Sequence, residues 1–455
     1  MTGNNMTGKE LITAVFTHEP AQRPPWVPFA GVHAGKLIGV KADKFLQNVD
    51  LLVEGLLRVN SLYQPDGQPV LFDLQIEAEI LGCELRWAAD APPSVASHPL
   101  KEAGEIPSHI PRKEEGRIPL ALEAMRRMKT AVGATTALYG LVTGPFTLAA
   151  HLRGTDIFMD MLDDAVYVKG LLQYTNEVAK TMARYYSEAG MDVIAVVDPM
   201  ISQISPDHFQ EFMRDPFSKL FIHIKSLGAY SSFFVCGNAT ANIEPMCRTR
   251  PDCIAVDENV HLPHAKEITD RYGIVIGGNL PLTTVMLLGT QEDNMKAVLD
   301  LMDSLTPGSW IVSPGCDMPY DTPIENCVAI AQAVRYPEKA HQMVAHYKAP
   351  DLKFEGKLPD YTHLSKPLVE VFTLDSATCA ACGYMLEAAK EAVKRFEGKV
   401  DLVEYKYTVR ENVARCRVMG VKQLPSLYIN GELAYSSLIP AVEELVDKIQ
   451  EKMKG

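Results

Sequence analysis

Apolar and polar positions along roughly the first 335 residues form blocks typical of strands that alternate with helices. Short apolar runs predict buried strands, and these are residues 26–29, 136–142, 192–197, 231–235, 253–256, 274–277 and 310–312. Longer amphipathic segments between them predict helices, such as residues 166–188 and 206–227, which end near glycine. About eight such units in a segment of this length favour a (β/α)8 TIM barrel over an open sheet.

A different pattern begins at Lys366. It predicts strands at residues 368–374, 400–406, 426–429 and 432–435, and helices at residues 383–396, 410–419 and 440–453. Asn430-Gly431 between the last two strands indicates a tight hairpin. A polar stretch with prolines precedes this pattern. We therefore predict three parts: a barrel at residues 8–336, a linker at 337–365 and a small α/β domain at 366–455.

Charge and composition narrow the expected partners and location. The formal net charge is −13, and it lies in the N-terminal part because basic and acidic residues balance within 366–455. Nucleic acid and anionic membranes are therefore unexpected partners. Since no apolar run reaches the roughly 20 residues that span a bilayer, and the first residues lack an apolar signal core, we expect a cytoplasmic protein. The nine cysteines are then expected to be free, metal-bound or catalytic.

Polar or thiol residues follow five successive predicted strands. They are Asp198, Cys236 with Asn238, Asp257 with Glu258, Asn279, and Cys316 with Asp317. Carboxyl ends of barrel strands meet at one face, where such folds place their sites, so a converging site is predicted there. Two thiols from different strands could hold a soft metal such as zinc, close a disulfide, or simply pack as small apolar side chains.

The small domain places Cys379-Ala380-Ala381-Cys382 between a strand and a helix. This arrangement resembles the thioredoxin fold, and residues 421–426 resemble its cis-proline loop. A helix N-terminus favours a thiolate, so Cys379 is the predicted attacking thiol and Cys382 its resolving partner. Half of a zinc site, or a docking module without redox activity, are the alternatives.

Several sequence motifs in the predicted barrel resemble those of the uroporphyrinogen decarboxylase superfamily. The most specific motif is residues 141–149, which include Gly144-Pro145-Phe146-Thr147. Less specific motifs lie at residues 72–83, 204–209 and 278–280. The resemblance covers about residues 8–335 and implies a (β/α)8 barrel. True decarboxylases of this superfamily carry an Arg-Gln-Ala-Gly-Arg phrase that neutralises a substrate with eight carboxylates. Both arginines are absent from the matching residues 28–35, which disfavours an octa-anionic substrate.

The resemblance is strongest to the branch of corrinoid-dependent methyltransferases. It implies methyl transfer between a methylcobamide on a partner corrinoid protein and a small-molecule thiol or folate-type acceptor. It also implies zinc held by Cys236 and Cys316, since zinc would present the acceptor as a thiolate. Phe234 stands where that branch has a histidine ligand, so another ligand is needed. The candidates from other strand ends are His33, Glu77, Glu79 and Asp198.

Other readings of the same residues stay open. A zinc-free site could bind a pterin-like acceptor through Asp198, Asn238, Asp257 and Asn279. Cys236 and Cys316 could instead be a redox pair served by the second domain. A decarboxylase would use Asp73 and Asp198 as its candidate acids. A barrel that only binds a corrinoid or tetrapyrrole protein is the non-catalytic alternative.

Overall fold

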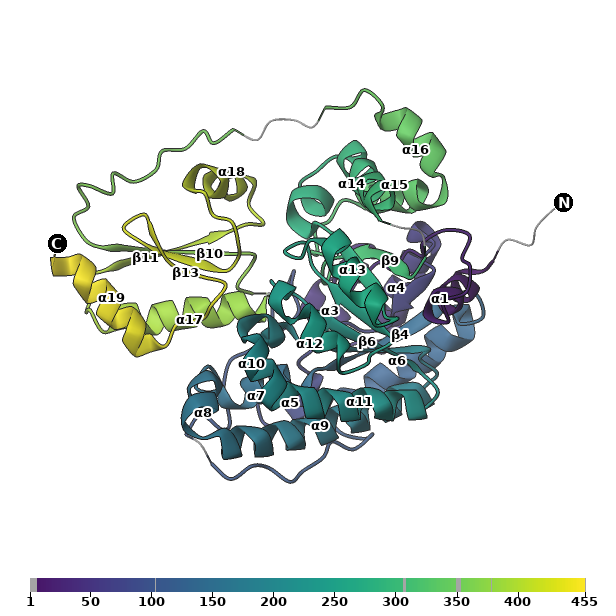
Figure 1. The fold of residues 1–455 in the computed structure, drawn as a ribbon, viewed down its shortest axis with the longest axis horizontal. Helices are drawn as coiled ribbons and strands as arrows, with labels where there is room; N and C mark the ends of the chain where they lie inside the picture. The colour runs from purple at the N-terminus through teal and green to yellow at the C-terminus, as the bar shows by residue number, and fades with distance from the viewer. Residues whose placement is uncertain (1–5, 103, 306–307, 349–352, 378, 455) are drawn as a thin grey trace. The chain divides into compact units, whose positions relative to one another are not determined.

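The first unit of the chain is built around seven parallel strands (Figure 1). The computed structural model describes residues 6–102, 104–305, 308–348, 353–377 and 379–454. In spatial order the strands are β1 (Gly67–Pro69), β4 (Ala137–Thr143), β5 (Val193–Val197), β6 (Tyr230–Val235), β7 (Cys253–Val256), β8 (Val275–Leu280) and β9 (Trp310–Pro314). β4 to β9 lie where the apolar runs predict strands, whereas β1 was not predicted.

The segment around Trp26 closes the sheet into a barrel. Trp26 forms a parallel bridge with Val312 of β9, and the backbone N–H of Val27 donates to the carbonyl of Val312 at 2.9 Å. On its other side the Trp26 carbonyl accepts from the N–H of Gly67, the first residue of β1, at 3.3 Å. The predicted strand at residues 26–29 therefore occupies the eighth position as a short bridge, and the (β/α)8 barrel is confirmed.

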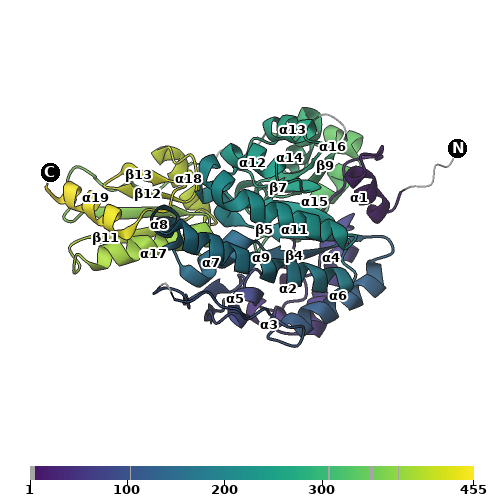
Figure 2. The same cartoon turned by 60° about the horizontal axis from the view of Figure 1, so that its bottom comes forward.

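Helices cover the outside of the strands, as Figures 1 and 2 show for α9 and α11, which pack side by side. The α-helices of this unit are α1 (Gly8–Phe16), α2 (His33–Lys36), α3 (Ala42–Phe45), α4 (Val49–Tyr63), α5 (Ile76–Ile80), α6 (Ile118–Val132), α7 (Pro145–Arg153), α8 (Ile157–Asp163), α9 (Ala165–Glu188), α10 (Pro206–His208), α11 (Arg214–Ser226), α12 (Ile243–Cys247), α13 (Leu262–Arg271), α14 (Gln291–Ser304), α15 (Ile324–Arg335) and α16 (Pro337–Val344). Among the described residues, no helix has the length and apolar character needed to cross a bilayer.

Shorter elements connect these helices and strands. They are the hairpin β2 (Leu85–Arg86) and β3 (Ser94–Val95), the 3-10 turns η1 (Pro199–Gln203) and η3 (Thr240–Asn242), and the π turns η2 (Phe209–Met213) and η4 (Leu282–Leu287). The helix predicted at residues 206–227 is thus three consecutive helical pieces, with η2 between α10 and α11. Isolated π turns are rare and often lie near functional sites, and η4 directly follows the end of β8.

The barrel interior is filled by apolar side chains. Phe234 of β6 is 1% exposed and packs against Phe29, with ring centroids 4.7 Å apart, and against Phe72, at 6.2 Å. Every residue of β4 and β5 is buried, as expected for parallel strands covered on both faces. Each large apolar side chain buried here stabilises the fold by roughly 1.5–3 kcal/mol. These packed side chains form a rigid apolar layer next to the polar residues at the strand ends.

The second unit is a four-stranded mixed sheet with helices. Its strands, in the order β11-β10-β12-β13, are β10 (Leu368–Thr373), β11 (Asp401–Lys406), β12 (Ser426–Ile429) and β13 (Glu432–Ser436). Its helices are α17 (Ala380–Lys394), α18 (Arg410–Met419) and α19 (Val442–Lys454). Asn430 and Gly431 have φ values of 50° and 77°, the left-handed pair that a two-residue hairpin needs. The predicted elements of this domain are confirmed, including the cis peptide bond before Pro425.

The two units divide between Tyr347 and Lys348. This division falls within the predicted linker, whose first residues form α16 and contact α14 and α15 of the barrel. Later residues of the linker contact the second unit. Phe354 lies under the Arg415 guanidinium at 5.1 Å, and the Tyr361 hydroxyl donates to Glu370 at 3.0 Å.

Candidate active site

Cys236 and Cys316 meet at the carboxyl ends of β6 and β9. Their Cα atoms are 6.0 Å apart, and their sulfurs form a disulfide. The two strands are not neighbours, since β7 and β8 lie between them, so the pair spans part of the barrel mouth. Both side chains are partly exposed and rest on the apolar core of the barrel. The structure therefore joins the two thiols that the sequence singled out.

The candidate third ligands are engaged elsewhere. The ring nitrogens of His33 lie 3.0 Å from the Tyr320 carbonyl and 2.7 Å from the Tyr63 hydroxyl. Burial lowers the pKa of His33 to about 4, so the ring is neutral and serves these two contacts. Glu79 accepts from the Arg117 guanidinium at 2.8 Å.

Glu77 and Phe234 do not supply a third metal ligand to the cysteine pair either. Glu77 is buried and accepts from the Thr143 hydroxyl at 2.9 Å and from the Thr143 N–H at 3.2 Å. Phe234 fills the barrel interior and offers no donor atom. In the part of the chain that the structure describes, no group of three His, Cys, Asp or Glu side chains is placed to hold a metal. The residues present thus do not fit a zinc site with three protein ligands.

Asp198 follows β5 and is bound to the start of α7. Its carboxylate accepts from the backbone N–H groups of Phe146 at 2.9 Å and Thr147 at 3.0 Å, and from the Thr147 hydroxyl at 2.6 Å. Burial raises the pKa of Asp198 to about 7. A Cβ atom at Gly144 would lie 2.3 Å from Asp198. The motif Gly144-Pro145-Phe146-Thr147 therefore lets this carboxylate bind the N-terminus of α7.

Asp257 and Glu258 follow β7 and connect the two cysteine loops. Asp257 accepts from the N–H of Gly237, the residue after Cys236, and from the N–H of Asn259 at 2.9 Å. Burial raises the pKa of Asp257 and of Glu258, and the charge of Asp257 raises that of Glu258 further. The two adjacent carboxyl groups, of which Asp257 is buried, titrate as a pair, so one proton is held near neutral pH.

Glu258 also reaches the loop of the second cysteine. Its Oε1 accepts from the N–H of Leu282 at the start of η4, at 3.2 Å. A Cβ atom at Gly315, which precedes Cys316, would lie 2.4 Å from Glu258 Oε2. Asp317 accepts from the N–H of Gly31 at 2.8 Å, and burial raises its pKa to about 8. Carboxyl groups with raised pKa values thus flank both cysteines.

The predicted cofactor-binding amides have local partners. The Asn279 amide donates to the carbonyls of Asp257 at 2.8 Å and Val260 at 2.7 Å. The Asn238 side chain accepts from the N–H of Thr240 at 3.2 Å. Asn279 therefore ties the ends of β7 and β8 together, and the binding role of these residues stays a prediction.

Arg117 forms an ion pair with Asp73, a candidate acid of the decarboxylase alternative. It precedes α6, donates to both Asp73 and Glu79, and stacks over the Trp87 ring at 4.9 Å. Asp73 also accepts from the Gln75 N–H at 2.9 Å. The ion pair with Arg117 binds the Asp73 carboxylate to the protein, so it is not open to a pyrrole.

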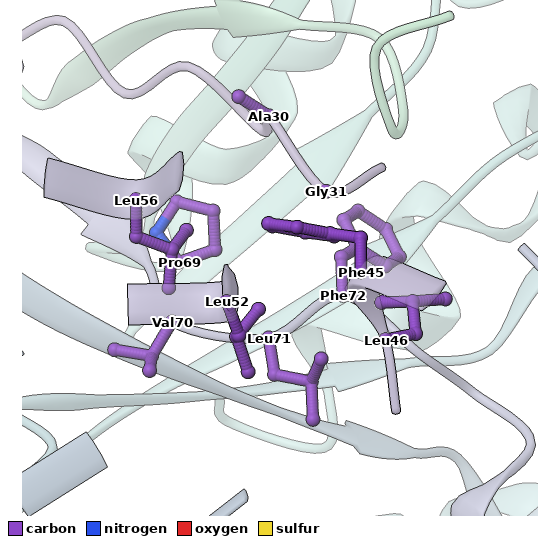
Figure 3. Close-up of a pocket in the computed structure, with 10 residues that line it drawn as sticks. All are labelled: Ala30, Gly31, Phe45, Leu46, Leu52, Leu56, Pro69, Val70, Leu71 and Phe72. Carbon is purple, nitrogen blue, oxygen red and sulfur yellow. The ribbon is translucent and has the colours of Figure 1, made fainter. Parts of the chain in front are cut away.

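A small apolar pocket, with no room for a water molecule, adjoins the segment that matches the decarboxylase arginine motif. Figure 3 shows that Ala30 and Gly31 of this segment line it together with side chains of α3, α4 and the region after β1. All ten lining residues are alanine, glycine, proline, valine, leucine or phenylalanine. A pocket without a charged side chain offers nothing to neutralise a carboxylate of a substrate.

The second unit places its two cysteines at the start of α17. Cys379 is the N-cap residue, is partly exposed, and its sulfur accepts from the N–H of Cys382 at 3.3 Å. Cys382 is buried, and burial raises its pKa well above the usual range. The N–H of Leu374 donates to the Cys382 sulfur at 3.3 Å. This geometry suits the predicted roles, with an accessible Cys379 and a sheltered Cys382.

The sequence assigned no role to three residues of this site. Strand-end position placed Glu258 beside Asp257 and Asp317 beside Cys316, but no motif gave either carboxyl group a function. Arg117 had no such signal, because it lies before a helix and reaches Asp73 only through the fold.

Comparisons with known proteins agree with both parts of the chain. Residues 7–336 match the family model of uroporphyrinogen decarboxylase, and residues 368–450 match a thioredoxin domain. A methylcobamide:CoM methyltransferase, MtbA, of Methanosarcina acetivorans is 29% identical over 271 residues, which cover 58% of this chain and 78% of that protein. A uroporphyrinogen decarboxylase of a Wolbachia species is 26% identical over 298 residues, 63% of this chain and 82% of that one.

A solved structure supports the fold. It is a methyltransferase from Methanosarcina mazei, which superposes with a TM-score of 0.67 at 23% identity and covers 73% of this chain and 99% of its own.

Proposed function

The chain belongs to the uroporphyrinogen decarboxylase family, and on that premise we propose that it is a corrinoid-dependent methyltransferase. The proposed reaction moves a methyl group between a methylcobamide, carried by a partner corrinoid protein, and a small acceptor, for which we favour a thiol over a folate. The relative MtbA, named for methylcobamide:CoM methyl transfer, supports the general kind of reaction. Zinc has no part in the proposal, because the described donors do not fit it.

One observation carries the proposal. Two cysteines and carboxyl groups whose pKa values are raised lie together at one end of the barrel, next to its apolar core. A methylcobamide supplies an electrophilic methyl group. An acceptor thiol becomes a strong nucleophile when it loses its proton. The site must therefore take up a proton and keep water away from the methyl group.

We assign the proton uptake to Glu258. Its Oε1 is bound to the N–H of Leu282, whereas Oε2 faces Gly315 beside Cys316. Its raised pKa allows proton exchange near neutral pH. In the balanced reaction the acceptor S–H bond breaks, the proton passes to Glu258, the sulfur bonds to the methyl carbon, and the methyl–cobalt electron pair stays with cobalt. Reduced Cys236 and Cys316 would line the acceptor site.

The decarboxylase alternative lacks comparable support. Asp73, one of its candidate acids, is paired with Arg117, and Asp198, the other, is bound by the N-terminus of α7. The segment at the decarboxylase arginine phrase borders an apolar pocket.

A direct assay tests the proposal. The reduced full-length protein is mixed anaerobically with methylcobalamin and, separately, with coenzyme M, 2-mercaptoethanol or tetrahydrofolate, and loss of the methyl–cobalt absorbance is followed. We expect thiol-dependent demethylation that falls roughly 100-fold in Glu258→Gln, with little change in the matched surface variant Glu267→Gln, which is exposed. Demethylation with tetrahydrofolate alone would overturn the thiol assignment. Inertness with every acceptor, together with turnover of uroporphyrinogen, would overturn the proposal.

A further inference from the structure

The nine cysteines divide sharply by exposure. Three cysteines are partly exposed: the disulfide pair Cys236 and Cys316, and Cys379. The others are Cys83, Cys247, Cys253, Cys327, Cys382 and Cys416, and all of them are buried. For five of these, excepting Cys382, burial raises the pKa to about 12. Thiol exchange needs an accessible thiolate, so the chain offers one accessible thiol and one accessible disulfide.

The accessible thiol stands in a geometry suited to attack. Cys379 caps α17, a helix of 15 residues, and its sulfur receives the N–H of Cys382. The helix N-terminus and this N–H thus both point at the sulfur of Cys379. Cys382 is close enough to contact Cys379 but sheltered from outside partners, which suits the second, resolving step.

Neither cysteine of the accessible disulfide lies at the N-terminus of a long helix. Cys236 and Cys316 lie in loops after β6 and β9, neither capping a helix of eight or more residues. Their flanking carboxyl groups, Asp257 beside Gly237 and Asp317 next in sequence, would oppose formation of a stable thiolate there. Exchange between the two pairs is thus expected to begin with attack by Cys379, and a soluble dithiol reductant that keeps Cys379 and Cys382 reduced sets the direction of net electron flow toward the barrel pair.

We propose that the second unit is an intrachain dithiol reductase whose substrate is the Cys236–Cys316 disulfide of the barrel. The Cys379 thiolate attacks one barrel sulfur, the barrel S–S bond breaks, and the other barrel cysteine leaves as a thiolate and takes a proton. Cys382 then loses its proton and attacks Cys379, which forms the Cys379–Cys382 disulfide and frees the second barrel thiol. Two electrons and two protons have moved to the barrel. A soluble dithiol reductant regenerates Cys379 and Cys382.

Covalent connection gives this exchange an advantage over small thiols. The chain runs from the barrel unit directly into the second unit, which begins at Lys348 and includes Phe354 and Tyr361. A tethered partner acts at an effective concentration on the order of millimolar. The exchange does not depend on the proposed methyl transfer, because it is measured on the sulfurs themselves.

The first experiment traps the intermediate. Oxidised full-length Cys382→Ser is treated with limiting dithiothreitol, and its tryptic peptides are analysed by mass spectrometry. We expect a peptide in which Cys379 is bonded to Cys236 or Cys316, because the resolving thiol is missing. The matched control Cys416→Ala removes another buried thiol of the same unit and should not accumulate this peptide. If Cys382→Ser yields no such linkage, the proposal is overturned.

The second experiment measures rate. Maleimide labelling follows reduction of Cys236 and Cys316 after dithiothreitol is added to wild-type protein and to Cys379→Ser/Cys382→Ser. We expect reduction roughly 10-fold or more faster in the wild type, at a rate independent of protein concentration. Equal rates would overturn the proposal, and a rate proportional to protein concentration would overturn its intrachain form. Circular dichroism confirms that each variant is folded. Failure of methyl transfer in either protein leaves this readout intact, so the two proposals fail separately.

Discussion

The Asp257 carboxylate accepts a hydrogen bond from the backbone N–H of Gly237, the residue that follows Cys236. This contact ties the end of β7 to the loop of the first cysteine, while Glu258, the next residue, reaches the loop of the second. Titration of this carboxyl pair is therefore coupled to the surroundings of both sulfurs, and the predictions below start from it.

Methyl transfer should depend on pH through Glu258. A base acts in its ionised form, and burial followed by the Asp257 charge raises the pKa of Glu258 to about 8. The rate with a thiol acceptor should therefore rise with pH up to about 8 and level off above it. Glu258→Gln should lose this ascending limb, whereas Glu267→Gln should retain it. A wild-type profile flat between pH 6 and 9, a range of roughly 1–2 units around that pKa, would contradict the role of Glu258.

Gly144→Ala should destabilise the barrel. The added Cβ would lie 2.3 Å from Asp198, which must shift and lose its hydrogen bonds to Phe146 and Thr147. Overpacking of this kind costs about 1–3 kcal/mol in the free energy of unfolding, measurable by urea titration. Gly104→Ala is the matched control, because nothing lies within 4 Å of its Cβ position. Equal stability of the two variants would show that Asp198 is not tightly seated.

Phe234→Ala should lower the free energy of unfolding by about 3–5 kcal/mol. Phe234 is 1% exposed and packs against Phe29 and Phe72 inside the barrel. Val166→Ala, at an exposed position, should change stability by no more than about 0.5 kcal/mol. A small effect at Phe234 would mean that this side chain faces the mouth instead of the core.

The barrel disulfide should stabilise the fold only under oxidising conditions. It closes a loop with a sequence separation of 80 residues, and such a crosslink typically contributes about 2–4 kcal/mol by restricting the unfolded chain. Cys236→Ser/Cys316→Ser should therefore unfold at lower urea than oxidised wild type and near the same urea as reduced wild type. Cys416→Ala, which removes a buried free thiol, should lose similar stability in both conditions. A double variant as stable as the oxidised wild type would argue against a bond between these sulfurs.

The sequence alone determined most of the architecture. Strands buried on both faces, such as β4 and β5, appear as mostly apolar runs, because their side chains must avoid water. The second unit was predicted nearly to the residue, since its strands, helices and Asn430-Gly431 turn each have local signals. β1 was missed because Gly67–Pro69 contains glycine, glutamine and proline, which have little strand signal of their own.

For the site, the sequence placed Cys236, Asp257 and Cys316 at strand ends, because strand direction in a barrel assigns those positions to one face. Only the tertiary structure decided which of them meet. The curvature and closure of the barrel bring β6 and β9 within reach of a disulfide, and no local pattern encodes that distance. The same holds for the pKa values of Asp198, Glu258 and Asp317. They are raised by burial, which depends on packing between segments far apart in the chain.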